Sequence, residues 1–204
     1  MRVLERGVQI DVAEVGDLQE AVCSLPAEGG ALHLPAGLYE IDETVLCELG
    51  EGQHLHFFGD GRASVVRFTA SDGSPLFALR GVPDSWWPDL RVTFRDLSFV
   101  GNHACGDALL LRWPNDMLID SCFFHGFGGT AIRVTPNATN VCIRDCWMRD
   151  CKRVLHADNL HHLTFRGNQT RSTTGGQVQH EQVYIGRHCR EVRLVDNHLA
   201  YGHA

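Results

Sequence analysis

Lysine is almost absent from this chain of 204 residues, since 17 of its 18 basic residues are arginine and Lys152 is the single lysine. A mechanism that needs a lysine base therefore has one candidate. Basic stripes are also lacking, and a formal net charge of -7 argues against nucleic-acid binding. No run is long and apolar enough to span a membrane. We expect neither a nucleic-acid partner nor a membrane partner.

The N-terminus lacks the apolar core of a secretory signal peptide, because residues 1–7 are MRVLERG. For a chain that truly starts at Met1, we therefore expect no export by the usual route and eight reduced cysteines. Cys142, Cys146 and Cys151 have three and four residues between them, unlike the CxxC pairs of zinc ribbons. We interpret the cysteines as buried apolar thiols, with a metal site or a disulfide as the alternatives.

A short phrase recurs through the second half of the chain. Its copies are VTFRDLSF (92–99), LIDSCF (118–123), VCIRDCWM (141–148), LTFRGNQT (163–170) and VRLVDNHL (192–199). Aligned on positions 96, 120, 145, 167 and 196, the copies are 24, 25, 22 and 29 residues apart. A repeat of this size predicts a solenoid, in which each unit buries its apolar edge against its neighbours. We expect Phe94, Ile143 and Leu194 to fill the interior.

Each later repeat holds a second apolar run, at 108–111, 131–134, 153–156 and 182–185. Two or three short strands in about 24 residues describe one coil of a parallel β-helix. A leucine-rich repeat is the alternative, because its phrase LxLxxNxL fits 192–199. The second runs are rich in Val and Ile, which favour strands over helices. We therefore expect an all-β solenoid, a parallel β-helix of about seven coils.

The N-terminal part predicts a helix over about residues 17–25. Asp17 can cap it, and Glu20 stands three positions later, as in a capping box. Its apolar stripe consists of Leu18, Ala21, Val22 and Leu25. Pro26 and the two glycines at 29–30 end it, and residues 31–41 then predict a strand, a turn and a second strand.

This opening, a capped helix followed by GGALHLPAGLYEI (29–41) and LHFFGDG (55–61), resembles that of the pectate lyase superfamily. The resemblance implies a right-handed parallel β-helix whose open end is plugged by the helix. It implies one domain over 1–204, with a cap region over 1–30, coils over 31–199 and a tail over 200–204. The superfamily includes pectin lyases, polygalacturonases, alginate epimerases and lyases, and phage tailspikes, so the resemblance specifies a fold and not an activity.

The catalytic phrases of that superfamily are missing here. No two aspartates are adjacent, and neither Arg-x-Lys nor Asp-Pro-His occurs. The acids at 96, 120, 145 and 196 fall in the turn column, where we expect a hydrogen-bonded ladder of Asn and Asp side chains. We therefore expect no cofactor and no metal, with calcium as an option if the chain is a lyase.

Three arginines, Arg95, Arg144 and Arg166, occupy one column of the repeat, and strand alternation points them away from the core. Stacked guanidinium groups match the carboxylates of an acidic polysaccharide. The alternative is a solvated face on which the arginines pair with neighbouring acids.

A histidine-rich segment supplies the candidate catalytic residues His156, Asp158 and Glu181. A histidine near an acid can act as a general acid–base pair. These side chains can equally be ordinary turn residues, and metal binding is the weakest alternative because no spacing defines a ligand set.

Trp86, Trp87 and Trp113 fall in expected turns or loops. Exposed indole rings offer flat faces on which sugars stack. They can instead pack on the solenoid or lie in a subunit interface.

Two functions follow from these features. The first is a polysaccharide-binding module of the virion-spike or surface type, and the alternative is a lyase, hydrolase or epimerase that acts on acidic polysaccharide. The last predicted coil lacks an obvious cap, and an exposed strand edge invites pairing with another chain. We expect a homo-oligomer, with a trimer as one option, or a part of a larger assembly. The expected location is cytoplasmic or virion-associated, and extracellular if the protein is released by lysis.

Overall fold

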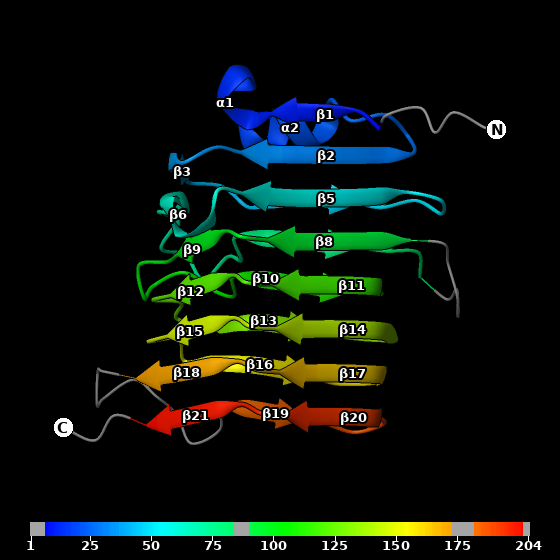
Figure 1. Cartoon of the computed structure of the whole chain (residues 1–204), viewed down its shortest axis with the longest axis vertical. Coiled ribbons are helices and arrows are strands. Elements are labelled where there is room, and N and C mark those ends of the chain that lie inside the picture. Colours follow the sequence, from blue (N-terminus) through cyan, green and yellow to red (C-terminus); the bar gives the residue numbers. More distant parts are fainter. Residues whose placement is uncertain (1–6, 84–89, 173–181, 202–204) are drawn as a thin grey trace.

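The computed structural model describes residues 7–83, 90–172 and 182–201. Their strands form three sheets, in which all 18 pairs of neighbouring strands are parallel. The chain visits the sheets in turn and winds into a β-solenoid of about seven coils, as expected (Figure 1).

The three sheets are named here A, B and C. Sheet A contains β1 (Gln9–Asp11), β2 (Gly29–Leu34), β5 (His54–Gly59), β8 (Arg91–Arg95), β11 (Asn115–Asp120), β14 (Ala138–Arg144), β17 (Leu160–Arg166) and β20 (Arg190–Val195). Sheet B contains β3 (Gly37–Ile41), β6 (Ser64–Phe68), β9 (Ser98–Val100), β12 (Phe123–His125), β15 (Trp147–Arg149), β18 (Gln169–Ser172) and β21 (His198–Tyr201). Sheet C contains β4 (Val45–Glu48), β7 (Phe77–Arg80), β10 (Leu109–Arg112), β13 (Thr130–Val134), β16 (Arg153–Ala157) and β19 (Val183–Ile185).

The second apolar runs of the repeats are the strands of sheet C. They form β10, β13, β16 and β19, and not the outer helices that a leucine-rich repeat requires. The leucine-rich alternative is therefore wrong. β-branched and other apolar side chains suit these positions because alternate residues of each strand point into the solenoid.

Aromatic and aliphatic side chains stack in register inside the coils. Phe94 pairs in register with Phe57 of the preceding coil and Ile119 of the next, and all three are fully buried. The Phe57 and Phe94 rings lie parallel with centroids 4.8 Å apart. Phe99 and Phe124 stack in the same way on sheet B at 5.1 Å. Each coil thus buries its apolar edge on its neighbours, as a solenoid requires.

The turn that follows sheet A adopts the left-handed backbone conformation in successive coils. Its φ values are 54° at Asp96, 54° at Ser121, 54° at Asp145, 66° at Gly167 and 53° at Asp196. The alignment of the repeat predicted that Asp120 lies in this column. That prediction is wrong by one residue, because Ser121 adopts the left-handed conformation in that coil. Asp120 pairs in register with Arg95 and Arg144, which places it among the arginines.

The hydrogen-bonded ladder lies one residue beyond the left-handed column. Asn168 accepts a bond from the Cys146 amide at 3.0 Å and donates one to the Ile143 carbonyl at 3.1 Å. Asn197 accepts bonds from both the amide and the side chain of Asn168 and donates one to the Phe165 carbonyl. The expected ladder therefore exists, but its members are asparagines and not the aligned aspartates.

All eight cysteines are free thiols. Cys122 and Cys146 take the ladder position in their coils, where their Sγ atoms contact backbone carbonyls. Burial raises the pKa of Cys151 to about 12 and also raises that of Cys146. Five of the eight are buried and Cys23 is exposed, which supports the interpretation of most of them as small apolar core residues.

Two short helices, α1 (Val12–Val15) and α2 (Leu18–Cys23), cover the N-terminal end of the stack (Figure 1). The expected helix is present but ends two residues early, and α1 was not expected. Asp17 caps α2 by accepting a bond from the Glu20 amide at 2.7 Å. The Gln19 amide group bonds both the N–H and the carbonyl of Leu46, which satisfies backbone groups of β4, the edge strand of sheet C.

The last coil leaves its apolar side chains open to solvent. Leu194 is 51% exposed, and Val195 and Leu199 are also exposed. The expectation that Leu194 fills the interior is therefore wrong. It does pair in register with buried Phe165, but none of the described residues forms a further coil to cover its other side.

Candidate functional site

The three candidate arginines lie in one outward column of sheet A, but Asp120 lies between them. In register order the column is Arg95, Asp120, Arg144 and Arg166. The intervening carboxylate changes the chemistry of the column, because only 6% of the Asp120 side chain is exposed and a buried carboxylate requires charged partners.

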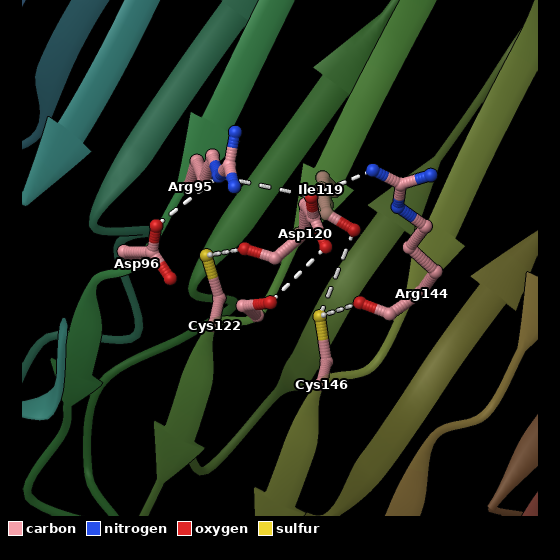
Figure 2. Close-up of polar contacts among 8 residues, drawn as sticks. Arg95, Asp96, Ile119, Asp120, Cys122, Arg144 and Cys146 are labelled. Atoms are coloured by element: carbon pink, nitrogen blue, oxygen red, sulfur yellow. Dashed lines mark hydrogen bonds and ion pairs between the residues drawn. The ribbon is translucent and has the colours of Figure 1, made fainter.

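Asp120 engages two of the three arginines (Figure 2). Its Oδ2 lies 2.8 Å from Nη2 of Arg144 and 3.9 Å from Nε of Arg95. Arg95 also contacts Asp96 at 3.1 Å. The hydrogen bond from Arg144 is the main cause that lowers the pKa of Asp120. This geometry favours a solvated face of paired charges for Arg95 and Arg144. Arg166 is exposed and forms no ion pair with the residues that the structure describes.

The second candidate group lies on the outer face of sheet C, where Leu110, Arg133, His156 and Tyr184 follow one another in register. Arg133 forms a bidentate contact with Asp107. Its Nε donates a hydrogen bond to Oδ2, and its Nη2 donates one to Oδ1 at 3.1 Å. Asp107 is buried and also accepts a bond from the Thr130 amide at 2.6 Å.

His156 lies between two guanidinium groups. Its Nδ1 is 3.3 Å from Nη1 of Arg133 and 3.1 Å from Nη1 of Arg153. Arginine can only donate, so Nδ1 accepts and Nε2 carries the proton. Burial, followed by the charges of Arg133 and Arg153, lowers the pKa of His156. The neutral imidazole is therefore a hydrogen-bond donor at Nε2, and the lone pair that a general base needs is occupied.

The other expected members of that catalytic group do not join His156. Asp158 influences its pKa only as a weaker charge, and no hydrogen bond joins the two side chains, both of which the structure describes. Glu181 lies outside the described residues. Among the residues that the structure describes, the hydrogen-bond partners of His156 are therefore two guanidinium groups and not a carboxylate.

Of the three candidate tryptophans, only Trp113 can be placed, because Trp86 and Trp87 lie outside the described residues. Trp113 directly follows β10, has a left-handed backbone with φ of 51° and is half-buried. The guanidinium carbon of Arg80 lies 5.3 Å from its ring centroid. One face of the indole is therefore covered by a neighbouring side chain.

Sequence reasoning missed a pair of aromatic residues on the outer face of sheet B. Phe123 and Trp147 are partners in register on adjacent coils, with ring centroids 5.6 Å apart, and both are half-buried. The position in the repeat that they share is held in the other coils by Leu38, Val65, Ser98, Gln169 and His198. Two successive aromatic residues at an outward position that no other coil fills with an aromatic ring other than histidine are the signal that could have identified them.

Arg62 completes this aromatic pair from the 3-10 turn η1 (Gly61–Ala63). Its guanidinium carbon lies 4.3 Å from the centroids of both Phe123 and Trp147, which is cation–π distance. The Ser98 hydroxyl donates to the Arg62 carbonyl at 3.0 Å and holds the turn against sheet B.

These residues form an open groove, called here the sheet B groove, with a volume of about 330 Å³. Its lining consists of Arg62, Val65, Ser98, Val100, Phe123, Trp147 and Arg149. Its surface is largely apolar, and the guanidinium groups of Arg62 and Arg149 are its charged components. Arg149 is oriented by Asp150, whose Oδ2 lies 3.0 Å from its Nε.

Among the described residues, no group of three or more His, Cys, Asp or Glu side chains is placed to hold a metal ion. Within the same ranges, no helix has the length and apolarity needed to cross a membrane.

Comparison with known proteins gives little more. No family model matches the chain, and no curated protein matches it either. Among solved structures, ORF18 of Geobacillus virus E2 is similar at 10% sequence identity and a TM-score of 0.33. The match covers 96% of this chain and 61% of the viral protein, so the chain spans about three-fifths of that protein's length. A likeness at this level supports no inference about function.

Proposed function

We propose that this chain is a pectin-lyase-like β-helix module that binds acidic polysaccharide in the sheet B groove. The observation that carries the proposal is the Phe123–Trp147 pair, two adjacent aromatic side chains on an outer face with a guanidinium group 4.3 Å from each ring centroid. On a β-solenoid the outward positions need no apolar side chain for folding, so we attribute the large rings there to binding, through the ring surface that Arg62 leaves uncovered.

The groove combines the two interactions that an acidic sugar chain offers. Sugar rings present apolar C–H faces that pack on aromatic rings, and their carboxylates match guanidinium groups in geometry and charge. Arg62 and Arg149 provide these groups within the same groove as Phe123 and Trp147. Arginine is better suited than lysine to this task because its planar fork can both stack and bind a carboxylate.

The described residues favour binding over catalysis. His156 is held as a donor by Arg133 and Arg153, and no hydrogen bond joins it to Asp158. The sheet A arginines are partly neutralised by Asp120. We therefore place recognition on sheet B, and an enzyme is the alternative that incubation with the same polymers detects.

The experiment compares the wild-type chain with Trp147→Ala and with Trp113→Ala, the same substitution on another part of the surface. Affinity for polygalacturonate, alginate and neutral dextran is measured by affinity electrophoresis. We expect the wild type to bind an acidic polymer and not dextran, and Trp147→Ala to weaken binding about 30-fold, as for an aromatic hot spot worth about 2 kcal/mol. The proposal would be overturned if Trp147→Ala bound the acidic polymer as tightly as the wild type, or if Trp113→Ala weakened binding as much as Trp147→Ala.

Incubation of the wild type with the same polymers is assayed for unsaturated ends by ultraviolet absorbance and for new reducing ends. Either product would identify the chain as a polysaccharide-active enzyme.

We also propose that the module works as a homo-oligomer or as a part of a larger virion or surface assembly. Leu194, Val195 and Leu199 are the exposed apolar side chains that such an assembly would bury on the last coil. Sedimentation at several protein concentrations tests self-association, and a trimer is one expected state.

A further inference from the structure

A histidine near the N-terminal end of the solenoid lies between two carboxylates. His33 belongs to β2, and its Nε2 lies 3.1 Å from Oδ1 of Asp60, while its Nδ1 lies 3.6 Å from Oδ2 of Asp11. Asp11 is the register partner of His33 on β1, the edge strand of sheet A, and Asp60 directly follows β5 on the other side of β2. These three residues, called here the His33 clasp, therefore join β2 to both of its neighbours.

Each carboxylate of the clasp also holds a backbone amide. Asp11 is the N-cap of α1, and its Oδ1 accepts a hydrogen bond from the Ala13 N–H at 2.9 Å. Oδ2 of Asp60 accepts one from the Ala36 N–H at 3.0 Å, in the turn between β2 and β3. Each carboxylate thus has one oxygen on the backbone and the other directed at His33. The clasp connects the start of α1 to the first two coils.

This geometry favours the doubly protonated form of His33. A neutral imidazole carries a hydrogen on one nitrogen only, so the lone pair of its other nitrogen would face a carboxylate oxygen. The charged ring directs an N–H at each carboxylate. The ring of Phe58 stacks on His33 with centroids 4.7 Å apart, and an aromatic face attracts a cation. The hydrogen bond from His33, followed by the one from the Ala36 N–H, lowers the pKa of Asp60, which keeps this carboxylate charged.

Tyr39 and His56 also lie beside the clasp, but neither is charged at neutral pH. Burial, followed by the charges of Asp11 and Asp60, raises the pKa of Tyr39 on β3. His56 on β5 packs against the aromatic ring of the clasp at 5.0 Å between centroids. Burial, followed by the charge of Arg95, lowers the pKa of His56. These groups therefore do not replace the charge at the centre of the clasp.

We propose that His33 is a pH-dependent clasp for the N-terminal cap, in which the imidazolium holds β1 and α1 on the first coils and loss of its proton loosens them. Carboxylates are charged above about pH 4, and histidine loses its charge as the pH rises past about 6.5. The stabilisation is therefore fully present between these values and is lost as the pH rises further. A loosened β1 uncovers the edge of β2, and an open strand edge can pair with another chain. The clasp shares no residue with the sheet B groove.

The first test is hydrogen exchange of the Ala13 and Ala31 amides. The Ala13 amide reports on the cap of α1, and the Ala31 amide, bonded to the Val8 carbonyl, reports on the attachment of β1. Protection, corrected for the intrinsic exchange rate, is measured at pH 5.5 and pH 8 in the wild type, in His33→Gln and in His188→Gln, which changes an exposed histidine of the last coil. We expect the protection of the wild type and of His188→Gln to fall about threefold at pH 8, as for a partly exposed ion pair. His33→Gln should have the lower protection at both pH values.

The second test is nitrogen-15 NMR of the histidine rings, in which we expect His33 to carry a hydrogen on both nitrogens at pH 6. Asp60→Asn keeps an acceptor for the Ala36 amide and removes the charge, so it should lower the protection of the same amides at pH 5.5. The clasp would be overturned by a neutral His33 ring at pH 6, by unchanged protection in Asp60→Asn, or by a fall in protection with pH that persists in His33→Gln. Polysaccharide binding that depends on Trp147 would survive each of these results, so the two proposals can fail separately.

Discussion

Substitution of Phe94 by alanine tests the stacking of coils most directly, because Phe94 lies in the middle of the aromatic interior. Its side chain is fully buried, stacks on Phe57 at 4.8 Å and meets Phe77 and Phe99 edge-on at 5.3 and 6.0 Å. Burial of a phenylalanine side chain is worth about 1.5–3 kcal/mol, and each aromatic pair adds about 0.5–1.5 kcal/mol. With the cavity included, we expect Phe94→Ala to lower the free energy of unfolding by about 3–5 kcal/mol.

Leu194→Ala provides the matched control, since Leu194 belongs to the same inward column in the last coil. Half of its side chain is already exposed, and the space left by truncation opens to solvent. Half of the transfer free energy of leucine amounts to about 1 kcal/mol, without a cavity contribution.

Urea unfolding followed by far-ultraviolet circular dichroism and by tryptophan fluorescence measures both variants. The unfolding transitions seen by the two signals must coincide before a free energy of unfolding is calculated, because the coils of a solenoid can unfold one after another. A cost below about 1 kcal/mol for Phe94→Ala would show that the coils are not stacked through this column. A cost for Leu194→Ala equal to that of Phe94→Ala would show that another surface covers the last coil.

Three further predictions concern the carboxylate of the arginine column, the asparagine ladder and the thiols. Asp120→Asn should destabilise the protein at pH 7. The hydrogen bond from Arg144 lowers the pKa of Asp120 in the folded state, so the contribution of its charge is fully present above the unfolded pKa of about 4. The difference in urea midpoint should shrink as the pH falls below about 4 and vanish as the pH passes through the lower pKa of the folded state. Asn168→Ala removes its side-chain bonds to two buried backbone groups and should cost about 2–4 kcal/mol in the same assay. Iodoacetamide at pH 8 should modify exposed Cys23 before Cys146 or Cys151, as resolved by peptide mass spectrometry, because burial raises the pKa of both inner thiols.

Much of the fold could be predicted from the repeat phrase. Its spacing specified a solenoid, its β-branched second runs specified strands, and Asp17 with Glu20 located the capped helix. The alignment failed at Asp120 because the LIDSCF copy has serine at the left-handed position, where other copies have Asp or Gly. Periodicity alone cannot tell which of two adjacent polar residues adopts a left-handed φ.

The candidate site was less predictable. The arginine column was correctly placed on one face, but the carboxylate between its members became visible only from the register of β8, β11 and β14. The catalytic role expected of His156 stays a prediction, and its contacts with Arg133 and Arg153, two residues that the sequence interpretation did not connect with it, argue against a general base. Phe123 and Trp147 belong to separate copies of the phrase, and the alignment error of one residue at Asp120 hid the position that they share.

The sequence by itself determined the coil length, the inward apolar columns and the N-terminal cap, because these depend on periodicity and on contacts between residues close in the chain. Only the tertiary structure decided which side chains of different coils meet. Parallel stacking brings residues about 24 positions apart to within one strand spacing, and a shift of one residue exchanges the inward and outward faces. The Phe123–Trp147 pair, the partners of Asp120 and the donors around His156 all depend on that register.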